Sequence, residues 1–107
     1  MKMSDRLIPI ATREVSYFAS EDKYVFLYYK DKKYPIDYTL EELEGLLDPL
    51  CFFRMNRQVT AQISAIAKIS NHLNGKLKVE LCPLYPEETY VSRERAAEFK
   101  NWLDGHC

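Results

Sequence analysis

The chain has 107 residues, of which 47% are hydrophobic and 29% charged, and its net charge is −1. This length fits one small domain, because two domains would each approach the size at which a single core becomes marginal. The composition excludes wholesale disorder. No apolar run approaches the roughly 18 residues of a membrane-spanning helix, and no signal-peptide segment follows the first residues, so we expect a cytoplasmic protein without a membrane partner.

The cysteine pattern does not predict a disulfide framework. Cys51, Cys82 and Cys107 are odd in number and lack CxxC spacing. This pattern argues against both a disulfide framework and a zinc site. We therefore expect three reduced thiols.

Catalytic motifs are also missing. The sequence has no HExxH, no glycine-rich phosphate loop, and no Cys or Ser in a setting that suggests an activated nucleophile. We expect no enzyme, cofactor or metal centre.

Aromatic and β-branched residues predict three strands near the N-terminus: Val15–Phe18, Tyr24–Tyr29 and Lys33–Tyr38. Pairing of the last two across a tight Asp31-Lys32 turn would place Tyr29 opposite Tyr34. Pro35 indicates that the third strand lies at a sheet edge.

A short helix is expected next. Thr39 and Glu42 form a capping-box pattern, and leucines at positions 40, 43 and 47 fall on one helix face. Pro49 marks the end of this helix.

Charge is strongly segregated along the middle of the chain. The segment 37–50 carries five acids and no Lys or Arg, whereas the segment 51–79 has no acid and five basic residues. From Phe53 to Ser64 apolar and polar residues alternate, which predicts an extended chain with one polar face. Arg57 alone breaks the apolar side, so we expect a bend or bulge that presents Asn56 and Arg57 outward.

Two more strands flank Leu73-Asn74-Gly75. A three-residue loop with Gly75 in the left-handed conformation pairs Ile69 with Val79, Lys68 with Glu80 and Ala67 with Leu81. A last strand, Glu88–Val91, leads to a C-terminal helix with Ser92 as N-cap. Its buried stripe is expected to comprise Ala96, Phe99 and Leu103. Short connections throughout favour antiparallel pairing.

Several basic and amide side chains suit nucleic acid. Arg54, Asn56, Arg57 and Gln58 include the groups that hydrogen-bond to base edges. Lys68, Lys76 and Lys78 would contact phosphates. The alternative is an ordinary solvated strand face. The aromatic run at 24–29 suggests a base-stacking platform, although core packing explains it more simply.

Four segments in this order resemble the LytTR-type DNA-binding domain of bacterial transcription regulators. They are YFASEDKYVFLYYKDKKYPIDYTLEEL, FFRMNRQ, IAKISNHLNGKLKV and YVSRERAAEFKNWL. The similarity runs from about Leu7 to Leu103, which we take as the core of a single domain over residues 1–107. The resemblance implies a mostly β fold of three small antiparallel sheets with two short helices, in which loops bind DNA.

The resemblance also implies contacts from three places. These are the turn with Lys23 and Tyr24, the segment with Asn56, Arg57 and Gln58, and the helix start with Arg93 and Arg95. Two departures are the less hydrophobic strand after this segment and Asn56 where family members often have His.

We expect sequence-specific binding of double-stranded DNA, with repeated half-sites occupied by paired copies and base reading in the major groove. The alternative is a protein-interaction module on the same fold, and a third reading is single-strand binding by exposed tyrosines. The chain has no room for a receiver domain, so it is either free-standing or the C-terminal part of a longer protein with a receiver or sensor partner.

Overall fold

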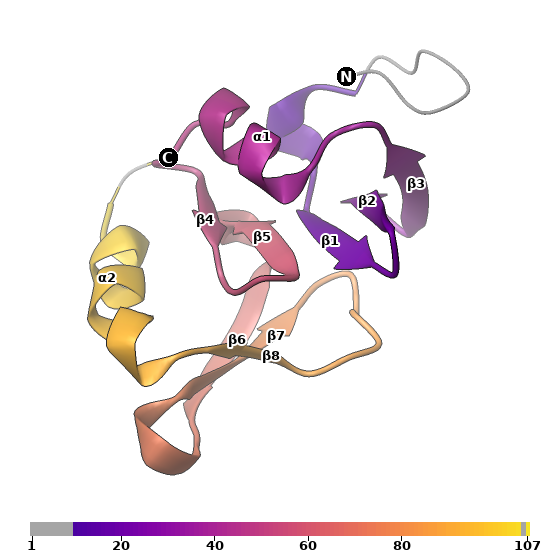
Figure 1. Cartoon of the computed structure of the whole chain (residues 1–107). Coiled ribbons are helices and arrows are strands. Elements are labelled where there is room, and N and C mark those ends of the chain that lie inside the picture. Colours follow the sequence, from indigo (N-terminus) through magenta and orange to yellow (C-terminus); the bar gives the residue numbers. More distant parts are fainter. Residues whose placement is uncertain (1–9, 106) are drawn as a thin grey trace.

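The computed structural model describes residues 10–105 and residue 107 (Figure 1). Eight strands and two α-helices follow in the order β1 (Tyr17–Glu21), β2 (Tyr24–Tyr29), β3 (Lys32–Ile36), α1 (Leu40–Leu46), β4 (Phe52–Arg54), β5 (Val59–Gln62), β6 (Ile66–Asn71), β7 (Leu77–Leu81), β8 (Thr89–Val91) and α2 (Arg93–Leu103). Short 3-10 turns occupy Thr12–Glu14, Ile63–Ala65 and Leu73–Gly75. Leu7, the expected start of the core, lies outside the described residues.

The strands form two antiparallel sheets. One has five strands in the order β3-β2-β1-β5-β4, and the other has three in the order β6-β7-β8. The expected mostly β, antiparallel class with two helices is confirmed. The described residues form two sheets rather than three, because β1 pairs with both β2 and β5 and so joins the N-terminal meander to the β4–β5 hairpin.

The five-stranded sheet is covered on both faces. Tyr17 and Phe18 are neighbours on β1 that point to opposite faces, and both are fully buried. On the Phe18 side the sheet packs against α1 and the segment that precedes β1. On the Tyr17 side it packs against the three-stranded sheet and α2. The molecule is thus layered, with α1 and α2 over opposite faces of this sheet (Figure 1).

The expected register of the first hairpin is wrong by two residues. Tyr29 pairs with Lys32, and Leu27 pairs with Tyr34. The turn is Lys30-Asp31, where Lys30 adopts a positive φ of 54° that non-glycine residues seldom take. A shift of two keeps each side chain on its face. Pro35 does lie on an edge strand, as expected.

The bend expected near Asn56 is a complete chain reversal. Residues 56–58 connect β4 to β5, which pair antiparallel with Phe53 opposite Ala61. The expectation of a solvated polar face is wrong at Thr60 and Gln62, which are 2% and 7% exposed. The reason is the five-stranded sheet itself, whose face on this side is covered.

The short helix is as predicted. The Glu42 N–H donates to Thr39 Oγ1 over 3.0 Å, and the Thr39 N–H donates to Glu42 Oε1 over 2.8 Å. This reciprocal pair is the predicted capping box. Leu40, Leu43 and Leu47 are buried against the sheet, also as predicted.

The second hairpin largely confirms its predicted register. Ile69 pairs with Val79 and Lys68 with Glu80, and Gly75 has a φ of 77°. Ala67 does not pair with Leu81, because a bulge between Ile66 and Lys68 places Ile66 opposite Leu81 instead. A bulge inserts one unpaired residue into a strand, and alternation of side chains gives little warning of it.

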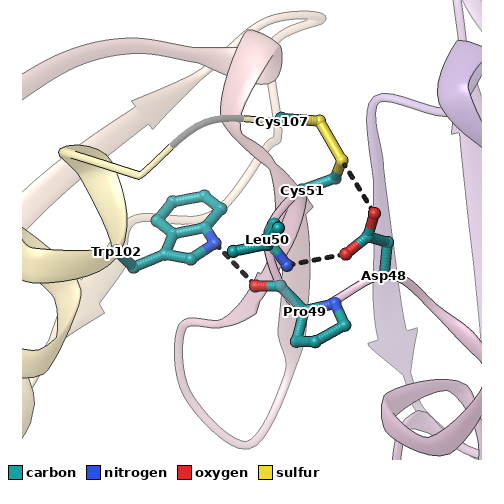
Figure 2. Close-up of a disulfide and its surroundings, with 6 residues drawn as sticks. All are labelled: Asp48, Pro49, Leu50, Cys51, Trp102 and Cys107. Atoms are coloured by element: carbon teal, nitrogen blue, oxygen red, sulfur yellow. Dashed lines mark hydrogen bonds between the residues drawn. A yellow bond between two sulfur atoms is a disulfide. The ribbon is translucent and has the colours of Figure 1, made fainter.

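The C-terminal helix packs through Phe99, which is fully buried, with Ala96 and Leu103 partly buried beside it. Ser92 is the N-cap residue, but its side chain makes no capping hydrogen bond. The Trp102 ring lies 5.2 Å from that of Phe53 on β4, and its Nε1–H donates to the Pro49 carbonyl over 3.1 Å (Figure 2).

The expectation of three reduced thiols is wrong for two of them. Cys51 and Cys107 form a disulfide across a sequence separation of 56 residues (Figure 2). Packing of α2 on β4 returns the chain to Cys51, which no local spacing could show. Cys82 is free and exposed. Within the described residues, no helix is long and apolar enough to cross a membrane, and no group of side chains could hold a metal ion.

Candidate nucleic-acid interface

The fold brings the three predicted contact segments to one region. The Ser20 N–H at the end of β1 donates to the Gln58 carbonyl over 2.7 Å, so the β1–β2 turn adjoins the β4–β5 loop, Asn56–Gln58. Asn56 Nδ2 donates to the Tyr90 carbonyl over 3.0 Å, two residues before Ser92, the N-cap of α2. The β4–β5 loop therefore lies between the other two segments.

Asn56 fixes the conformation of its own loop. Its Oδ1 accepts from the Gln58 N–H over 2.8 Å and from the Val59 N–H over 3.1 Å. An Asn side chain that binds backbone two residues on is a common turn device. Three of its hydrogen-bonding positions are thus used within the protein.

Arg54 also holds the β4–β5 loop, through its guanidinium group. Its guanidinium donates to the carbonyls of Asn56 over 2.7 Å and Arg57 over 2.9 Å. It also forms ion pairs with Glu44 at 2.6 Å and Glu41 at 3.4 Å on α1, and its side chain is only 17% exposed. The acid-rich helix thus neutralises a basic residue of the acid-free segment.

Arg95 links α2 to β4. Its guanidinium donates to the Arg54 carbonyl over 2.5 Å, pairs with Glu98 at 3.2 Å, and lies over the Phe53 ring at 4.7 Å. This set of contacts positions the start of α2 against the β4–β5 hairpin.

The remaining predicted side chains in these segments face water. Lys23, Arg57, Gln58 and Arg93 are exposed, and Tyr24 is 63% exposed. No described side-chain hydrogen bond or ion pair engages the guanidinium groups of Arg57 and Arg93. Arg93 lies against the second hairpin, since a Cβ on Gly75 would meet its Cγ and Cδ at 2.8 Å.

A basic groove of about 570 Å³ opens between the β4–β5 loop, Lys76 and the start of α2. Its lining residues are Arg54, Met55, Asn56, Arg57, Lys76, Tyr90, Ser92 and Arg95. Four of the eight are cationic and none is acidic. Because Arg54 is paired with Glu44 and Arg95 with Glu98, Arg57 and Lys76 supply the charge that remains for a ligand. Such a concave cationic surface matches the charge of a phosphate backbone.

Two of the three predicted phosphate lysines, Lys68 and Lys78, lie on the three-stranded sheet, and only Lys76, just before β7, lines the groove. Lys78 pairs with Glu88 at 3.5 Å, and Lys68 stands opposite Glu80. Acidic neighbours therefore offset two of the three lysines.

Sequence reasoning missed Tyr90 and His72. Tyr90 lines the groove, and its ring centroid lies 4.7 Å from that of His72 and 5.9 Å from Lys76 Nζ. Its hydroxyl donates to Glu88, which raises the pKa of Tyr90 and lowers the pKa of Glu88. Alternation with buried Thr89 and Val91 was the available signal that Tyr90 points outward.

The tyrosines do not form a stacking platform. Tyr28 is buried and stacks on Tyr17 with ring centroids 4.3 Å apart, and Tyr29 and Tyr34 pack against the core on the α1 side. Tyr24 alone of this group is largely exposed. The core-packing interpretation of the aromatic run is confirmed.

Residues 5–104 match the family model described as the LytTr DNA-binding domain. The chain belongs to this family. Residues 5–104 are therefore a DNA-binding domain, and its family is not an enzymatic one.

The chain is also similar to one curated protein and one solved structure. An uncharacterized response regulatory protein of Vibrio cholerae is 32% identical over 76 residues, which are 67% of this chain and 29% of that protein. The chain thus spans less than a third of this curated relative. A solved LytTr DNA-binding domain, from a protein of Bacillus cereus assigned as a methyl-accepting/DNA response regulator, superimposes with a TM-score of 0.79. That alignment covers 97% of this chain and 94% of the solved chain at 24% identity, and it supports the shared fold.

Proposed function

We propose that this LytTR domain recognises a specific double-stranded DNA sequence, with the β4–β5 loop inserted in the major groove. The observation that carries the proposal is the acid-free basic groove where the loop meets Lys76 and the start of α2. Arg57 and Gln58 are exposed and chemically suited to base edges. Lys23, Tyr24 and Arg93 would contact DNA from either side.

The predicted contact residues take two roles in this proposal. Arg54, Asn56 and Arg95 already bind protein groups, so we assign them to positioning the loop. Lys76 is the phosphate contact that the groove favours, whereas Lys68 and Lys78 would contribute weakly because acids face them.

The setting of the domain also belongs to the proposal. We propose that pairs of copies bind repeated half-sites, that the protein acts in the bacterial cytoplasm, and that it has a receiver or sensor partner. The similarity to a response regulatory protein supports this setting. We also propose that residues 1–107 form one domain. The protein-interaction alternative would gain if Glu21, Asp22 or Glu94 neutralised the contact face. Glu21 is engaged by Lys33 at 2.6 Å and by the Tyr28 hydroxyl, whereas Asp22 and Glu94 are exposed beside Lys23 and Arg93.

The test is a fluorescence-anisotropy titration with a randomised pool of duplex DNA, followed by sequencing of the bound fraction. Both steps are done at low and near-physiological salt. We expect a repeated motif whose affinity falls by about 1–3 kcal/mol in Arg57→Ala. Lys100 is exposed on α2 and does not line the groove, so Lys100→Ala is the matched control for loss of one positive charge.

Three outcomes separate the readings. Loss of affinity restricted to the selected motif supports base reading by Arg57. An equal loss on every sequence reassigns Arg57 to backbone contact. Binding that disappears with salt and enriches no motif favours the protein-interaction alternative.

A further inference from the structure

A second hollow lies along the open edge of β4, on the other side of Arg54 and Arg95 from the basic groove. This edge cleft has a volume of about 320 Å³, at the lower end of the range for small-molecule sites of about 300–1,000 Å³. It lies between α1 and α2, and Phe52, Phe53 and Trp102 line it. Figure 2 shows Trp102 beside the segment that precedes β4.

The backbone of β4 offers one free donor and one free acceptor to this cleft. The Met55 N–H donates to Val59 and the Ile63 N–H to Cys51, so alternate residues bond to β5 and those between point away from it. The outward groups belong to Phe52 and Arg54.

Two of these four outward groups are satisfied. The Phe52 N–H donates to the Asp48 carbonyl over 3.0 Å, and the Arg54 carbonyl accepts from Arg95. The Phe52 carbonyl and the Arg54 N–H have no hydrogen-bond partner within the described part of the chain. They flank Phe53, which is the spacing at which a single residue of a parallel strand bonds to its neighbour.

A third polar group at this site also lacks a partner. Thr60 lines the cleft and is 2% exposed, and its Oγ1 is the one buried side-chain polar atom without a partner among the described residues. A buried hydroxyl left unpaired carries a free-energy cost of about 1–3 kcal/mol.

The charges of the cleft cancel. Arg54 is paired with Glu44 and Arg95 with Glu98, and all four line the hollow. A charged ligand would have to break one of these pairs, whereas an uncharged ligand would not. The complementary molecule is therefore neutral, with an apolar body and an amide edge.

We infer that the edge cleft binds a small neutral amino-acid derivative capped as an amide at both ends, whose own N–H donates to the Phe52 carbonyl and whose own C=O accepts from the Arg54 N–H. Arg54 and Arg95 line both hollows. A ligand beside them would change how firmly Arg54 holds the carbonyls of the β4–β5 loop. Binding is thus expected to alter DNA affinity, and only this second step rests on the proposed function.

The first experiment measures binding without DNA. N-acetyl-phenylalanine amide is the probe, and the ester O-acetyl-phenyllactamide, which lacks the residue's N–H, is its matched comparator. Trp102 is the only tryptophan, so its fluorescence reports the cleft, and the NMR signal of the Arg54 amide reports the edge. We expect both signals to change at millimolar amide, with the ester about tenfold weaker.

Two neighbouring helix positions supply the matched variants. Glu98 and Ala97 are both exposed on α2, but only Glu98 lines the cleft. Glu98→Phe should fill the cleft and abolish binding, whereas Ala97→Phe should retain it. No change at Arg54 with the amide, or equal binding by the two variants, would overturn the site. Equal binding of amide and ester would overturn the assignment of an amide.

The second experiment repeats the DNA titration with saturating N-acetyl-phenylalanine amide. We expect DNA affinity to change by about fivefold or more, the usual lower range of coupling between sites. Binding in the cleft with unchanged DNA affinity would overturn the regulatory step. Absence of DNA binding by the unliganded chain would count against the proposed function alone, because the NMR result stands by itself.

Discussion

Arg54 is the residue at which β4, α1 and the β4–β5 loop meet. Its planar guanidinium serves two loop carbonyls and two carboxylates at once. Arg presents a fork of donors with fixed geometry, and Lys presents a single ammonium, so the two are not interchangeable here. Side-chain chemistry made Arg54 a candidate for contact with bases, but its guanidinium binds groups inside the domain.

We predict that Arg54→Ala lowers the free energy of unfolding by about 2–3 kcal/mol, because the carbonyls of Asn56 and Arg57 lose a charged donor. Arg54→Lys retains a charge near Glu44 but cannot reach both carbonyls, so it should recover only part of the loss. Urea unfolding measures both values. Full recovery by Lys would show that charge, and not the fork, matters.

Tyrosine ionisation gives a prediction for alkaline pH. Burial raises the pKa of Tyr85 from 10.0 to about 12, and burial also raises the pKa of Tyr17 and Tyr28. Because the unfolded chain loses these protons first, this contribution to stability is complete below pH 10 and is lost as the pH rises through the folded-state pKa.

We therefore expect the free energy of unfolding to decrease above pH 10, by at most about 1.4 kcal/mol per pH unit for each tyrosine. Urea unfolding across this range, with tyrosinate absorbance as a second readout, measures the slope. Tyr85→Phe should show a shallower slope, and an unchanged slope would exclude Tyr85 as a contributor.

At the scale of elements, the β6–β7 hairpin supports the start of α2. Gly75 has a φ of 77°, and a Cβ at this position would lie 2.8 Å from Arg93 side-chain atoms. Gly45 in α1 has no neighbour within 4 Å of such a Cβ. The two glycines therefore allow a matched comparison of the same substitution.

We predict that Gly75→Ala lowers the free energy of unfolding by about 1–2 kcal/mol, since Ala is strained in the left-handed region. Displacement of Arg93 should weaken DNA binding as well. Gly45→Ala should raise the free energy of unfolding by about 0.5–1 kcal/mol, because Ala favours helix. Equal effects on stability at the two positions would contradict the role of Gly75 conformation.

The elements that the sequence predicted well are those whose signals are local. The Thr39–Glu42 capping box and the Leu73–Gly75 loop each depend on a few adjacent residues. The Lys30-Asp31 turn was missed because Lys gives no sign that it will adopt a positive φ. Missing this turn shifted the predicted β2–β3 register by two residues, so each side chain still lies on the predicted face of the sheet.

The candidate site was predicted only in part for the same reason. Resemblance to the family indicated which segments meet, and exposure of Arg57 agrees with the expected bend. The partners of Arg54 come from a helix ten or more residues away, and the Tyr90 carbonyl lies 34 residues from Asn56. No local pattern reports such non-local contacts.

At the scale of the whole molecule, the Cys51–Cys107 disulfide closes most of the second half of the chain into a loop. The link spans 56 residues, which corresponds to a chain-entropy contribution of at most about 4 kcal/mol. It ties the segment after α2 to the residue before β4, beside the contact of Trp102 with Pro49 (Figure 2).

We predict that Cys107→Ser lowers the free energy of unfolding by up to about 4 kcal/mol, measured by urea unfolding. Reductant should lower the stability of the wild-type chain equally and leave Cys107→Ser unchanged. Cys82→Ser is the control, because Cys82 is free and exposed. If reductant leaves the wild-type chain unaffected, the bond is not formed in solution.

The separation of α1 from the three-stranded sheet also determines how the domain approaches a polyanion. Glu41, Glu42 and Glu44 lie over one face of the five-stranded sheet, and Lys76 and Arg93 lie on the other side of the molecule. These five side chains form a charge separation across a domain whose net charge is −1. In the field of DNA this separation would favour diffusional encounters that begin with the basic groove facing the duplex.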